Sequence, residues 1–565
     1  MTETRIPAGS AIFPRLKALG VDYVFCNSGT DFPPIIEGLA TAKARGEALP
    51  EAVVIPHESA ALGMAHGYTL MTGRAQAVMM HTNVGLANGA MGAINAAAEQ
   101  IPVILMSGRT PTLEAGRLGA RTVPIGWGQE MRDQHALVRE ATKWDYELRF
   151  PEQITELLDR AHAIASSTPK GPVYLSLPRE VLCEEIVFDD LTAEPSIAPA
   201  TGAADQASIE KLAAMLATAK SPLIIAQRGV GDADGFAAFA RWAEEWGIAV
   251  SSWWVNQLAI ATDHPCHVGP NPGPWMAEAD VVLAIDCLAP WMPEAHALKQ
   301  DAKVVHLGPD PLYARFPVRN FPSHLSLAGD TGATLTALFK AMQLHARDEG
   351  MIAERRKRIA QANQSWRDDV SRVSTPVTGQ TLTKPQLSRA LSDALKGRKS
   401  TVFCELGAVL GPMERSEAHS WFDTPHSGGL GWSFPAAMGA QLADPDRLCV
   451  AVMGDGSYMF ANPTVCHQIA EAMQLPILIV IANNSEWDAV RRSVTSIYPE
   501  GHAAKSNQMP LVELKPSPDF CKTAEASRAF ARRVEKPEEL SDAIEAALKA
   551  IETEGRCAVL DVKIR

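Results

Sequence analysis

The sequence predicts an α/β protein made of three doubly wound domains, each with a parallel sheet. Short apolar runs typical of buried strands alternate with helical stretches along the whole chain. The 565 residues suffice for three or four domains of about 150 residues each. A linker candidate at 187–205, and a charged helix expected at 351–373 with the Thr/Pro stretch after it, separate the parts. The expected domains are residues 1–186, 187–350 and 375–565.

The first domain is expected to alternate strands with helices rich in alanine and glycine. Its predicted strands are 21–25, 52–56, 76–80, 103–106 and 173–177, and its predicted helices are 11–19, 59–71 and 88–98. Small residues let a helix approach its neighbour closely. We therefore expect the last two helices to pack tightly, either on the sheet or on another subunit.

The other two domains follow the same pattern. In the middle domain the predicted strands are 222–226, 249–251, 281–285 and 303–307, and in the third domain the predicted elements are helix 384–395, strand 401–405, helix 537–551 and strand 557–562. The glycine-bearing segment 227–235 does not fit the dinucleotide fingerprint GxGxxG, so no tightly bound flavin is expected.

Composition excludes several classes of function. The net charge of −13, without a basic cluster, argues against nucleic-acid binding. No apolar run approaches the roughly 20 residues of a membrane span. The nine cysteines form no CxxC pair, and the start MTETRIPAGSAIF has no signal-peptide pattern. A reduced, cytoplasmic protein is the expectation.

The stretch 448–484 carries the strongest motif. An apolar run ends at the tripeptide 454–456, a polar loop is expected next, and a helix is expected to begin at Pro463. A second buried run ends at Asn483 and Asn484. A strand–helix–strand crossover would place Asp455 and Asn484 side by side at the carboxyl ends of two parallel strands. Such oxygen ligands suit Mg²⁺ carrying a phosphorylated ligand.

This motif resembles the cofactor motif of thiamine diphosphate-dependent enzymes: GDG, then 26 residues (457–482), then NN. Three α/β domains with the motif in the last one resemble the decarboxylase branch, which includes benzoylformate decarboxylase and acetolactate synthase. The resemblance implies a pyrimidine-binding, a middle and a diphosphate-binding domain. It also implies a Mg²⁺ held by the Asp455 and Asn484 side chains and the main-chain oxygen of Glu486.

The glycine loop 426–443, HSGGLGWSFPAAMGAQLA, resembles the family segment that supports the bent cofactor. By this resemblance Gly428 offers its carbonyl to the pyrimidine amino group, Leu430 separates the two rings, and Ser457 binds the diphosphate. The implied cofactor-binding residues are Gly428, Leu430, Gly454, Asp455, Gly456, Ser457 and Asn484. The alternative for the loop is an ordinary helix entry.

Two residues of the first domain are candidate catalytic groups. In the family, a carboxylate bonded to the pyrimidine ring shifts it to the imino form that activates the cofactor, and Glu58 resembles that carboxylate. The alternative is a glutamate favoured at a helix N-terminus by the dipole. His81, 23 residues later, matches a substrate-handling histidine of benzoylformate decarboxylase. A structural histidine at a strand end is the alternative.

Candidate substrate residues are weaker: Asn27, Ser28 and Thr30 in the first strand-end loop, Arg109, where several relatives carry glutamine, and Trp487 after the metal loop. Arg109 and Trp487 depart from the family pattern and indicate an unusual substrate. For Asn27 and Ser28 the alternative is a role in forming the turn.

The resemblance implies a thiamine diphosphate- and Mg²⁺-dependent enzyme that cleaves or forms a C–C bond next to a carbonyl. A 2-oxo acid decarboxylase or carboligase similar to benzoylformate decarboxylase is favoured. The alternatives are an acetolactate synthase-like transferase, an acyloin or 2-hydroxyacyl-CoA lyase, and a flavin-linked oxidase. The family further implies a homo-oligomer, a dimer or a dimer of dimers (homotetramer), with active sites at the subunit interface.

Overall fold

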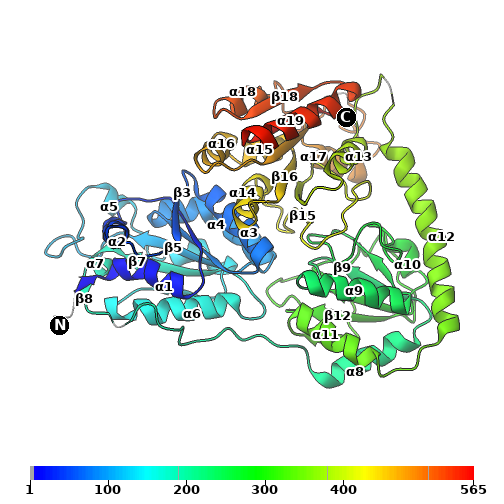
Figure 1. Ribbon diagram of the computed structural model, residues 1–565, viewed down its shortest axis with the longest axis horizontal. Coiled ribbons are helices and arrows are strands. Elements are labelled where there is room, and N and C mark those ends of the chain that lie inside the picture. The colour runs from blue at the N-terminus through cyan, green and yellow to red at the C-terminus, as the bar shows by residue number, and fades with distance from the viewer. Residues whose placement is uncertain (1–4, 189, 378, 507) are drawn as a thin grey trace. The chain divides into compact units, whose positions relative to one another are not determined.

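The computed structural model describes residues 5–188, 190–377, 379–506 and 508–565. Residues 1–4, at the start where no signal peptide is expected, lie outside the described part. Residue 189 of the expected linker 187–205 and residue 378, in the stretch after the charged helix, also lie outside it. The chain divides into two compact units. Unit 1 is the chain up to Gly202 together with Pro425–Gly429, and unit 2 is Ala203–Thr424 with Leu430–Arg565. Figure 1 labels their elements.

Unit 1 is built on a parallel sheet with the strand order β3-β2-β4-β5-β7-β6. Its strands are β2 (Tyr23–Cys26), β3 (Glu51–Val54), β4 (Gln76–Met80), β5 (Val103–Arg109), β6 (Asp145–Glu147) and β7 (Val173–Pro178). Its helices are α1 (Ile12–Ala18), α2 (Pro33–Arg45), α3 (Glu58–Thr72), α4 (Thr82–Ala98), α5 (Ile125–Gly128), α6 (Ile154–Ser166) and α7 (Arg179–Leu182). Two short strands, β1 (Ile6–Pro7) and β8 (Glu185–Ile186), pair antiparallel.

The small-residue helices α3 and α4 pack against each other, as Figure 1 also shows. A Cβ added at Gly92 would lie 2.5 Å from Cβ of Leu62, so only glycine fits there. Helix α4 begins at Thr82 and not at the predicted residue 88. Its first turn contains Thr82 at a φ of +36° and Gly85, which are poor helix formers and hid the start of the helix from sequence analysis.

Unit 2 holds two parallel sheets. The first has the order β10-β9-β11-β12-β13 and comprises β9 (Pro222–Ala226), β10 (Ala249–Ser251), β11 (Val281–Ile285), β12 (Lys303–Gly308) and β13 (Leu325–Ala328). Its helices are α8 (Gln206–Thr218), α9 (Ala233–Trp246), α10 (Gly273–Met276) and α11 (Thr331–Met342).

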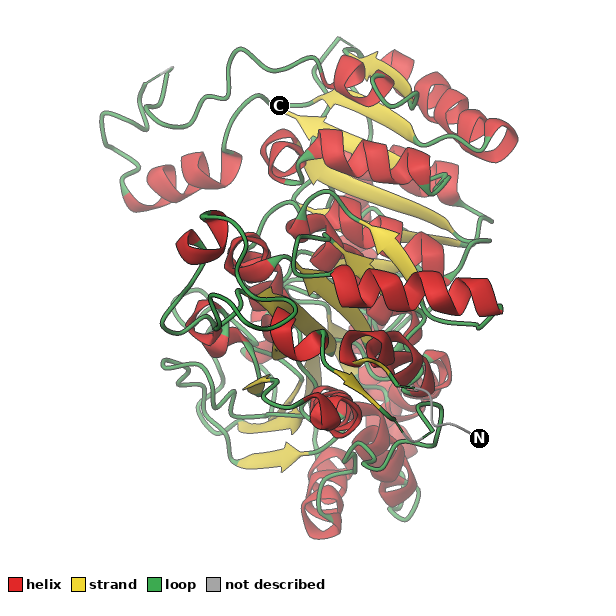
Figure 2. Cartoon of the chain, turned by 90° about the vertical axis from the view of Figure 1, so that its left-hand side faces the viewer, coloured by secondary structure: helices red, strands yellow, loops and turns green. Residues whose placement is uncertain are grey.

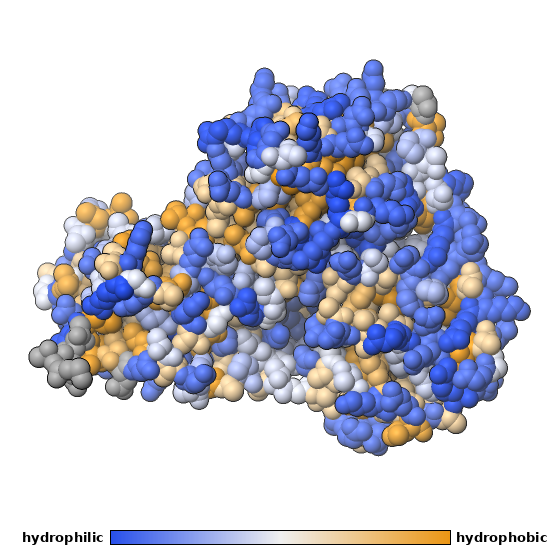
Figure 3. Space-filling view, viewed as in Figure 1, coloured by the Kyte–Doolittle hydropathy of each residue, from blue (hydrophilic) through white to orange (hydrophobic). Residues whose placement is uncertain are grey.

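The charged helix α12 (Glu349–Ser374) is fastened to this sheet domain by its arginines. The buried Arg355 guanidinium donates to the carbonyls of Trp246 and Ala219, at the C-terminal ends of α9 and α8. A cation there offsets the negative ends of both helix dipoles. The surface drawn in Figure 3 is largely hydrophilic along this helix.

The second sheet of unit 2 has the order β15-β14-β16-β17-β19-β18, and helices cover both its faces (Figure 2). Its strands are β14 (Ser400–Glu405), β15 (Trp421–Asp423), β16 (Leu448–Gly454), β17 (Leu478–Asn483), β18 (Phe530–Val534) and β19 (Ala558–Lys563). Its helices are α13 (Lys384–Leu395), α14 (Ser433–Ala443), α15 (Asp455–Phe460), α16 (Pro463–Ala472), α17 (Asp488–Ile497), α18 (Phe520–Glu525) and α19 (Leu540–Glu554). The predicted three-domain parallel α/β fold is confirmed, while the boundaries at 186, 350 and 375 stay a prediction.

The predicted crossover around the GDG motif is present. Strands β16 and β17 are parallel neighbours, with Gly454 opposite Ala482. The expected polar loop after the motif is wrong: Asp455 to Phe460 form the short helix α15, and α16 then begins at Pro463. Glycine on both sides of Asp455 suggested a turn, whereas Gly454 is the extended N-cap residue and Asp455 the first helical one. No helix of the described residues is long and apolar enough to cross a membrane.

Candidate active site

Asp455 stands where β16 ends and α15 begins, with 2% of its surface exposed. Burial raises the pKa of its carboxyl to about 6, although backbone N–H groups of Gly456 and Ser485 act in the opposite direction. Its Oδ2 atom is buried and accepts no hydrogen bond within the described part of the chain. A buried polar atom without a partner is costly, and a cation with its own oxygen ligands would relieve that cost. The site therefore fits a metal-bound diphosphate.

The two asparagines of the NN pair have different surroundings. Asn483 turns toward the sheet and donates to Oδ1 of the buried Asp561 at 2.9 Å. Asn484 is half-buried, and its Oδ1 accepts the Glu486 N–H at 3.2 Å. The Glu486 carboxylate is held by Arg491 at 2.6 Å, and its carbonyl accepts from the Asp488 N–H at 3.1 Å. The first asparagine thus fixes the strand end, and the second lies beyond it.

No three His, Cys, Asp or Glu side chains gather as a metal centre among the described residues. A metal at the GDG–NN edge would therefore depend on one carboxylate, one amide oxygen and a main-chain oxygen. The phosphate oxygens of a ligand would complete its shell. Mg²⁺ is the ion that accepts such a sparse set of protein ligands.

The last residue of the GDG motif, Gly456, has no room for a side chain. A Cβ added at Gly456 would lie 2.2 Å from Cζ3 of Trp487. The Trp487 ring also meets the ring of Phe460 edge-on, with centroids 5.9 Å apart. Trp487 thus lies directly against α15, beside the Asp455 end of the sheet.

Glu405, which the sequence analysis placed only at the end of a strand, anchors the glycine loop. It is fully buried and accepts the N–H groups of Gly431 at 2.6 Å and Ser433 at 2.7 Å. The Ser457 hydroxyl also hydrogen-bonds its carboxylate. Burial raises the pKa of Glu405, and these hydrogen bonds oppose the rise. The loop and the helix after GDG therefore share one buried carboxylate.

The N-terminal part of the glycine loop belongs to unit 1. Gly428 is exposed at a φ of +71°, in the left-handed region that favours glycine. Its neighbour Gly429 accepts from the Asn95 amide of α4 at 3.0 Å, and the Ser427 hydroxyl donates to the same Asn95 at 2.6 Å. Leu430 is half-buried and begins the part that belongs to unit 2.

Glu58 is the first residue of α3 and is 4% exposed. Its Oε1 accepts from the Asn27 amide at 2.8 Å, and its Oε2 accepts from the Asn88 amide at 3.1 Å. A Cβ added at Gly85 of α4 would lie 2.9 Å from Oε1. Two amide donors and a close helix therefore fix the direction of this carboxylate. They also bring Asn27, a predicted substrate residue, into the same cluster.

His81, the N-cap residue of α4, is paired with a carboxylate that the sequence analysis missed. Its Nδ1 lies 2.5 Å from Oδ1 of the buried Asp31, and the Thr82 N–H donates to the other oxygen of Asp31 at 3.3 Å. The hydrogen bond with Asp31 raises the pKa of His81, and burial opposes the rise. Asp31 directly follows Thr30, so its place in the strand-end loop was the available signal.

Two glycines make room for this pair. A Cβ added at Gly29 would lie 2.0 Å from His81 Nδ1, and one added at Gly108 would lie 1.5 Å from Asp31 Oδ2. The predicted substrate residues Ser28 and Thr30 are exposed, and the Thr30 carbonyl accepts from Arg179 at 3.0 Å. The structure thus brings Asn27 and His81 into polar clusters of unit 1 and leaves Ser28 and Thr30 at the surface.

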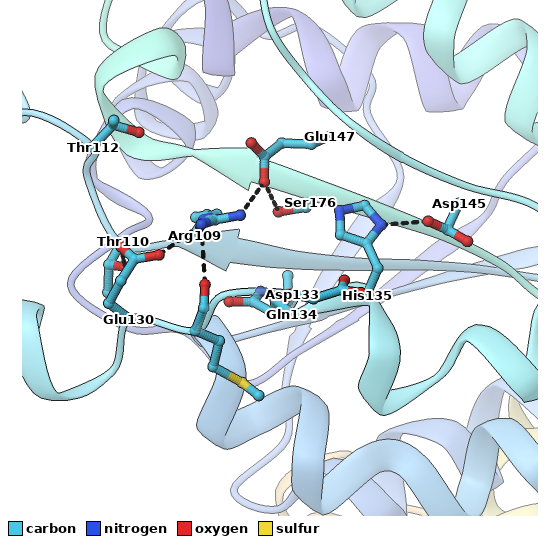
Figure 4. A network of polar contacts seen from close by, with 12 residues as sticks. Arg109, Thr110, Thr112, Glu130, Asp133, Gln134, His135, Asp145, Glu147 and Ser176 are labelled. Carbon is cyan, nitrogen blue, oxygen red and sulfur yellow. Dashed lines mark hydrogen bonds and ion pairs between the residues drawn. The ribbon is translucent and has the colours of Figure 1, made fainter.

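Arg109, at the end of β5, is held on two sides by carboxylates (Figure 4). Its guanidinium lies 2.6 Å from Oε1 of Glu130 and 2.7 Å from Oε2 of Glu147. It also donates to the carbonyl of Met131 at 3.2 Å. Its donors are thus engaged by the protein itself, which favours a role in holding the following loop.

Comparisons with known proteins match all three sheet domains of the chain. The thiamine pyrophosphate enzyme N-terminal TPP binding domain matches residues 6–137, the central domain residues 209–338 and the C-terminal TPP binding domain residues 407–562. A probable 2-ketoarginine decarboxylase of Pseudomonas aeruginosa is 27% identical over 96% of this chain and 92% of its own. A probable acetolactate synthase large subunit of Methanocaldococcus jannaschii is 25% identical over 95% of this chain and 89% of its own. The fold resembles a solved thiamine diphosphate-dependent 4-hydroxybenzoylformate decarboxylase of Rhodococcus jostii, with a TM-score of 0.78, 21% identity and 99% of both chains covered.

The substitution Gly108→Ala should break the His81–Asp31 pair, because the added methyl group takes the place of Asp31 Oδ2. The hydrogen bond that raises the pKa of His81 would then be lost, so this pKa should fall. An NMR titration of the His81 ring, assigned by its loss in His81→Gln, measures the change. Gly126→Ala is the matched control, because its nearest neighbour would be 3.9 Å away. An unchanged titration in Gly108→Ala would contradict the pair.

Proposed function

The chain belongs to the thiamine pyrophosphate enzyme family, and from this premise we propose that it is a thiamine diphosphate- and Mg²⁺-dependent decarboxylase of 2-oxo acids. The single observation that supports the cofactor site best is the Oδ2 atom of Asp455 at the shared end of β16 and β17, which is buried and has no hydrogen-bond partner among the described residues. When bound, the cofactor supplies an electron sink for the C–C bond next to a carbonyl. The chain's own residues must place it and handle the protons.

In this proposal the Asp455 carboxylate, the Asn484 amide oxygen and the Glu486 main-chain oxygen hold Mg²⁺. Ser457 and the backbone of Gly454 and Gly456 hold the diphosphate, while Gly428 and Leu430 support the pyrimidine side of the cofactor. Glu405, by fixing Ser433 and Ser457, keeps the loop and the helix start in register. The location in the cytoplasm is part of the same proposal, and the nine free cysteines agree with it.

Glu58 is proposed to hydrogen-bond the pyrimidine ring of the bound cofactor and to favour its imino form. The amides of Asn27 and Asn88 orient the carboxylate for this contact. His81 is proposed to move a proton at its Nε2 atom, since Nδ1 is committed to Asp31. Ser28, Thr30 and Trp487 are proposed to contact the substrate.

The substrate class is proposed from the relatives. Those named as a 2-ketoarginine decarboxylase and a 4-hydroxybenzoylformate decarboxylase both act, by their names, on 2-oxo acids. Relatives named acetolactate synthase match almost the whole chain, so carboligation is the second candidate function. The two reactions share bond cleavage and differ in whether a proton or a second carbonyl completes the reaction.

Thiamine diphosphate should bind tightly only with a divalent cation, because Asp455 alone would meet the diphosphate as like charge. Asp455→Ala should abolish the metal-dependent part of binding. Isothermal calorimetry on protein stripped of cofactor, with Mg²⁺ or with chelator, measures both effects. Asp446→Ala, an exposed carboxylate of the same unit, is the control. Equal affinity with and without chelator would rule out the metal site.

Loaded with thiamine diphosphate and Mg²⁺, the protein should release CO₂ from at least one 2-oxo acid. A panel that spans aliphatic, aromatic and guanidinium side chains tests the substrate class by coupled CO₂ release. Glu58→Gln should slow turnover by about 10²-fold or more, because the amide keeps the shape but cannot carry the proton. Product analysis then separates aldehyde from acyloin. A panel without CO₂ release, in protein that binds cofactor, would contradict decarboxylation.

The active site is proposed to form between two copies of the chain, with Glu58 from one and Asp455 from the other. Mixing the inactive variants Glu58→Gln and Asp455→Ala under subunit exchange should then restore activity. About a quarter of wild-type activity is expected, because about half of the dimers are mixed and each has one intact site of two. Proven exchange without recovered activity would place the whole site within one chain.

A further inference from the structure

The second ring nitrogen of His81 has a partner outside the predicted site. The amide nitrogen of Gln129 lies 3.1 Å from His81 Nε2. With Nδ1 2.5 Å from the Asp31 carboxylate, the proton of the neutral ring is on Nδ1, and Nε2 carries the lone pair. The Gln129 N–H then donates to that lone pair. Gln129 follows α5 in the loop between β5 and β6, which sequence analysis did not mark.

A carboxamide suits a histidine that changes its charge. It donates through its nitrogen to the neutral ring, and after rotation by 180° it accepts through its oxygen from the N–H of the charged ring. A carboxylate at the same place would accept only, and a hydroxyl would give a shorter reach. The same side chain therefore orients the ring before and after proton transfer.

We propose that Gln129 is a positioning residue that orients the His81 ring through Nε2 before and after proton transfer and releases this nitrogen while it exchanges a proton with the substrate. The inference rests on the proposed function for its substrate, but the contact itself does not. The charged groups that face His81 are Asp31, from the loop after β2, and Glu58, at the start of α3. Gln129 is the neutral member of this group.

Arg109 helps to fix the position of the loop that carries Gln129. Glu130, the residue after Gln129, receives Arg109 at 2.6 Å, Arg121 at 2.5 Å and the Thr110 hydroxyl at 2.7 Å. Arg109 is itself tied to Glu147 of β6 at 2.7 Å. We call these residues the Glu130 clamp: Arg109, Thr110, Arg121, Glu130 and Glu147.

Further contacts fasten the same loop on both sides of the clamp. Arg121 also donates to the carbonyls of Pro111 at 2.6 Å and Gly126 at 3.2 Å. The Gln134 amide, further along, is buried and donates to the Gly108 carbonyl at 2.9 Å. Figure 4 shows Arg109 and Glu130 at the end of one strand and Glu147 and His135 beside the next. The clamp thus ties the loop that carries Gln129 to β5 and β6.

The test is the titration of His81 in the whole protein, followed by NMR of labelled histidine. Gln129→Glu should raise the pKa of His81 by about 1–2 units, because the added carboxylate can stabilise only the charged ring. Gln153→Glu adds the same charge elsewhere in unit 1, where the side-chain oxygen already accepts a backbone N–H, and should leave the titration unchanged. Equal titrations in these two variants would overturn the proposal.

The role of the Glu130 clamp in positioning Gln129 is tested by combining substitutions in a double-mutant experiment. Adding Arg109→Met to Gln129→Glu should remove at least half of the rise in the His81 pKa, since the new carboxylate would no longer be held in place. Thr110→Val, which removes one hydrogen bond to Glu130, serves if the arginine variant does not fold. A full-sized rise in both backgrounds would show that the clamp does not position Gln129.

Activity separates this inference from the proposed function. With an active 2-oxo acid, the pH profile of kcat should shift with the His81 titration in Gln129→Glu, while KM changes little. If the His81 titration shifts but the protein turns over no 2-oxo acid, the Gln129–His81 contact is supported and the proposed decarboxylase function is contradicted. If a 2-oxo acid is turned over but the His81 titration does not shift, the proposed role of Gln129 is contradicted and the proposed decarboxylase function is supported.

Discussion

The parallel pairing of β16 with β17 is the constraint on which the candidate site depends. It puts Asp455 and the NN pair at the same sheet edge, where Asp455 is buried and one of its oxygens accepts no hydrogen bond from the residues that the structure describes. Leaving a buried acceptor unpaired costs about 1–3 kcal/mol. The neighbouring Asn483 and Asp561 are paired with each other. The Asp455 oxygen, which has no hydrogen-bond partner among the described residues, is thus an acceptor that a bound ligand could satisfy.

Glycines in each of the two units leave space for functional side chains. Gly108 leaves room for Asp31, Gly29 for His81, and Gly456 for the Trp487 ring. In each case a methyl group would lie within about 2 Å of the functional side chain, well inside van der Waals contact. Their role is therefore steric, since none of these three has a positive φ. At these glycines the side chains of Asp31, His81 and Trp487 pack directly against the backbone.

Sequence analysis predicted what depends on local pattern and missed what depends on contacts across the fold. Apolar runs gave the central strands, and the GDG–NN spacing gave the crossover. Glu405 carried no such signal, because its partners Gly431 and Ser433 come 26 and 28 residues later. Gln129 lies 48 residues from His81, directly after the short helix α5. Short or glycine-rich helix starts, at Asp455 and Thr82, were hidden because local propensity there favours turns.

The charge balance around Arg109 bears on how a 2-oxo acid would be recognised. Its guanidinium faces two carboxylates, and Glu130 is shared with Arg121, so the cations and anions of the clamp match in number. A substrate carboxylate that took Arg109 would leave Glu130 or Glu147 partly unpaired in a half-buried place, which offsets most of the gain. Recognition by a neutral donor, such as the second N–H of the Asn27 amide whose other N–H is donated to Glu58, avoids that loss. Asn27, which orients Glu58, would then also contact the substrate anion, so substrate binding would be coupled to the position of the Glu58 carboxylate.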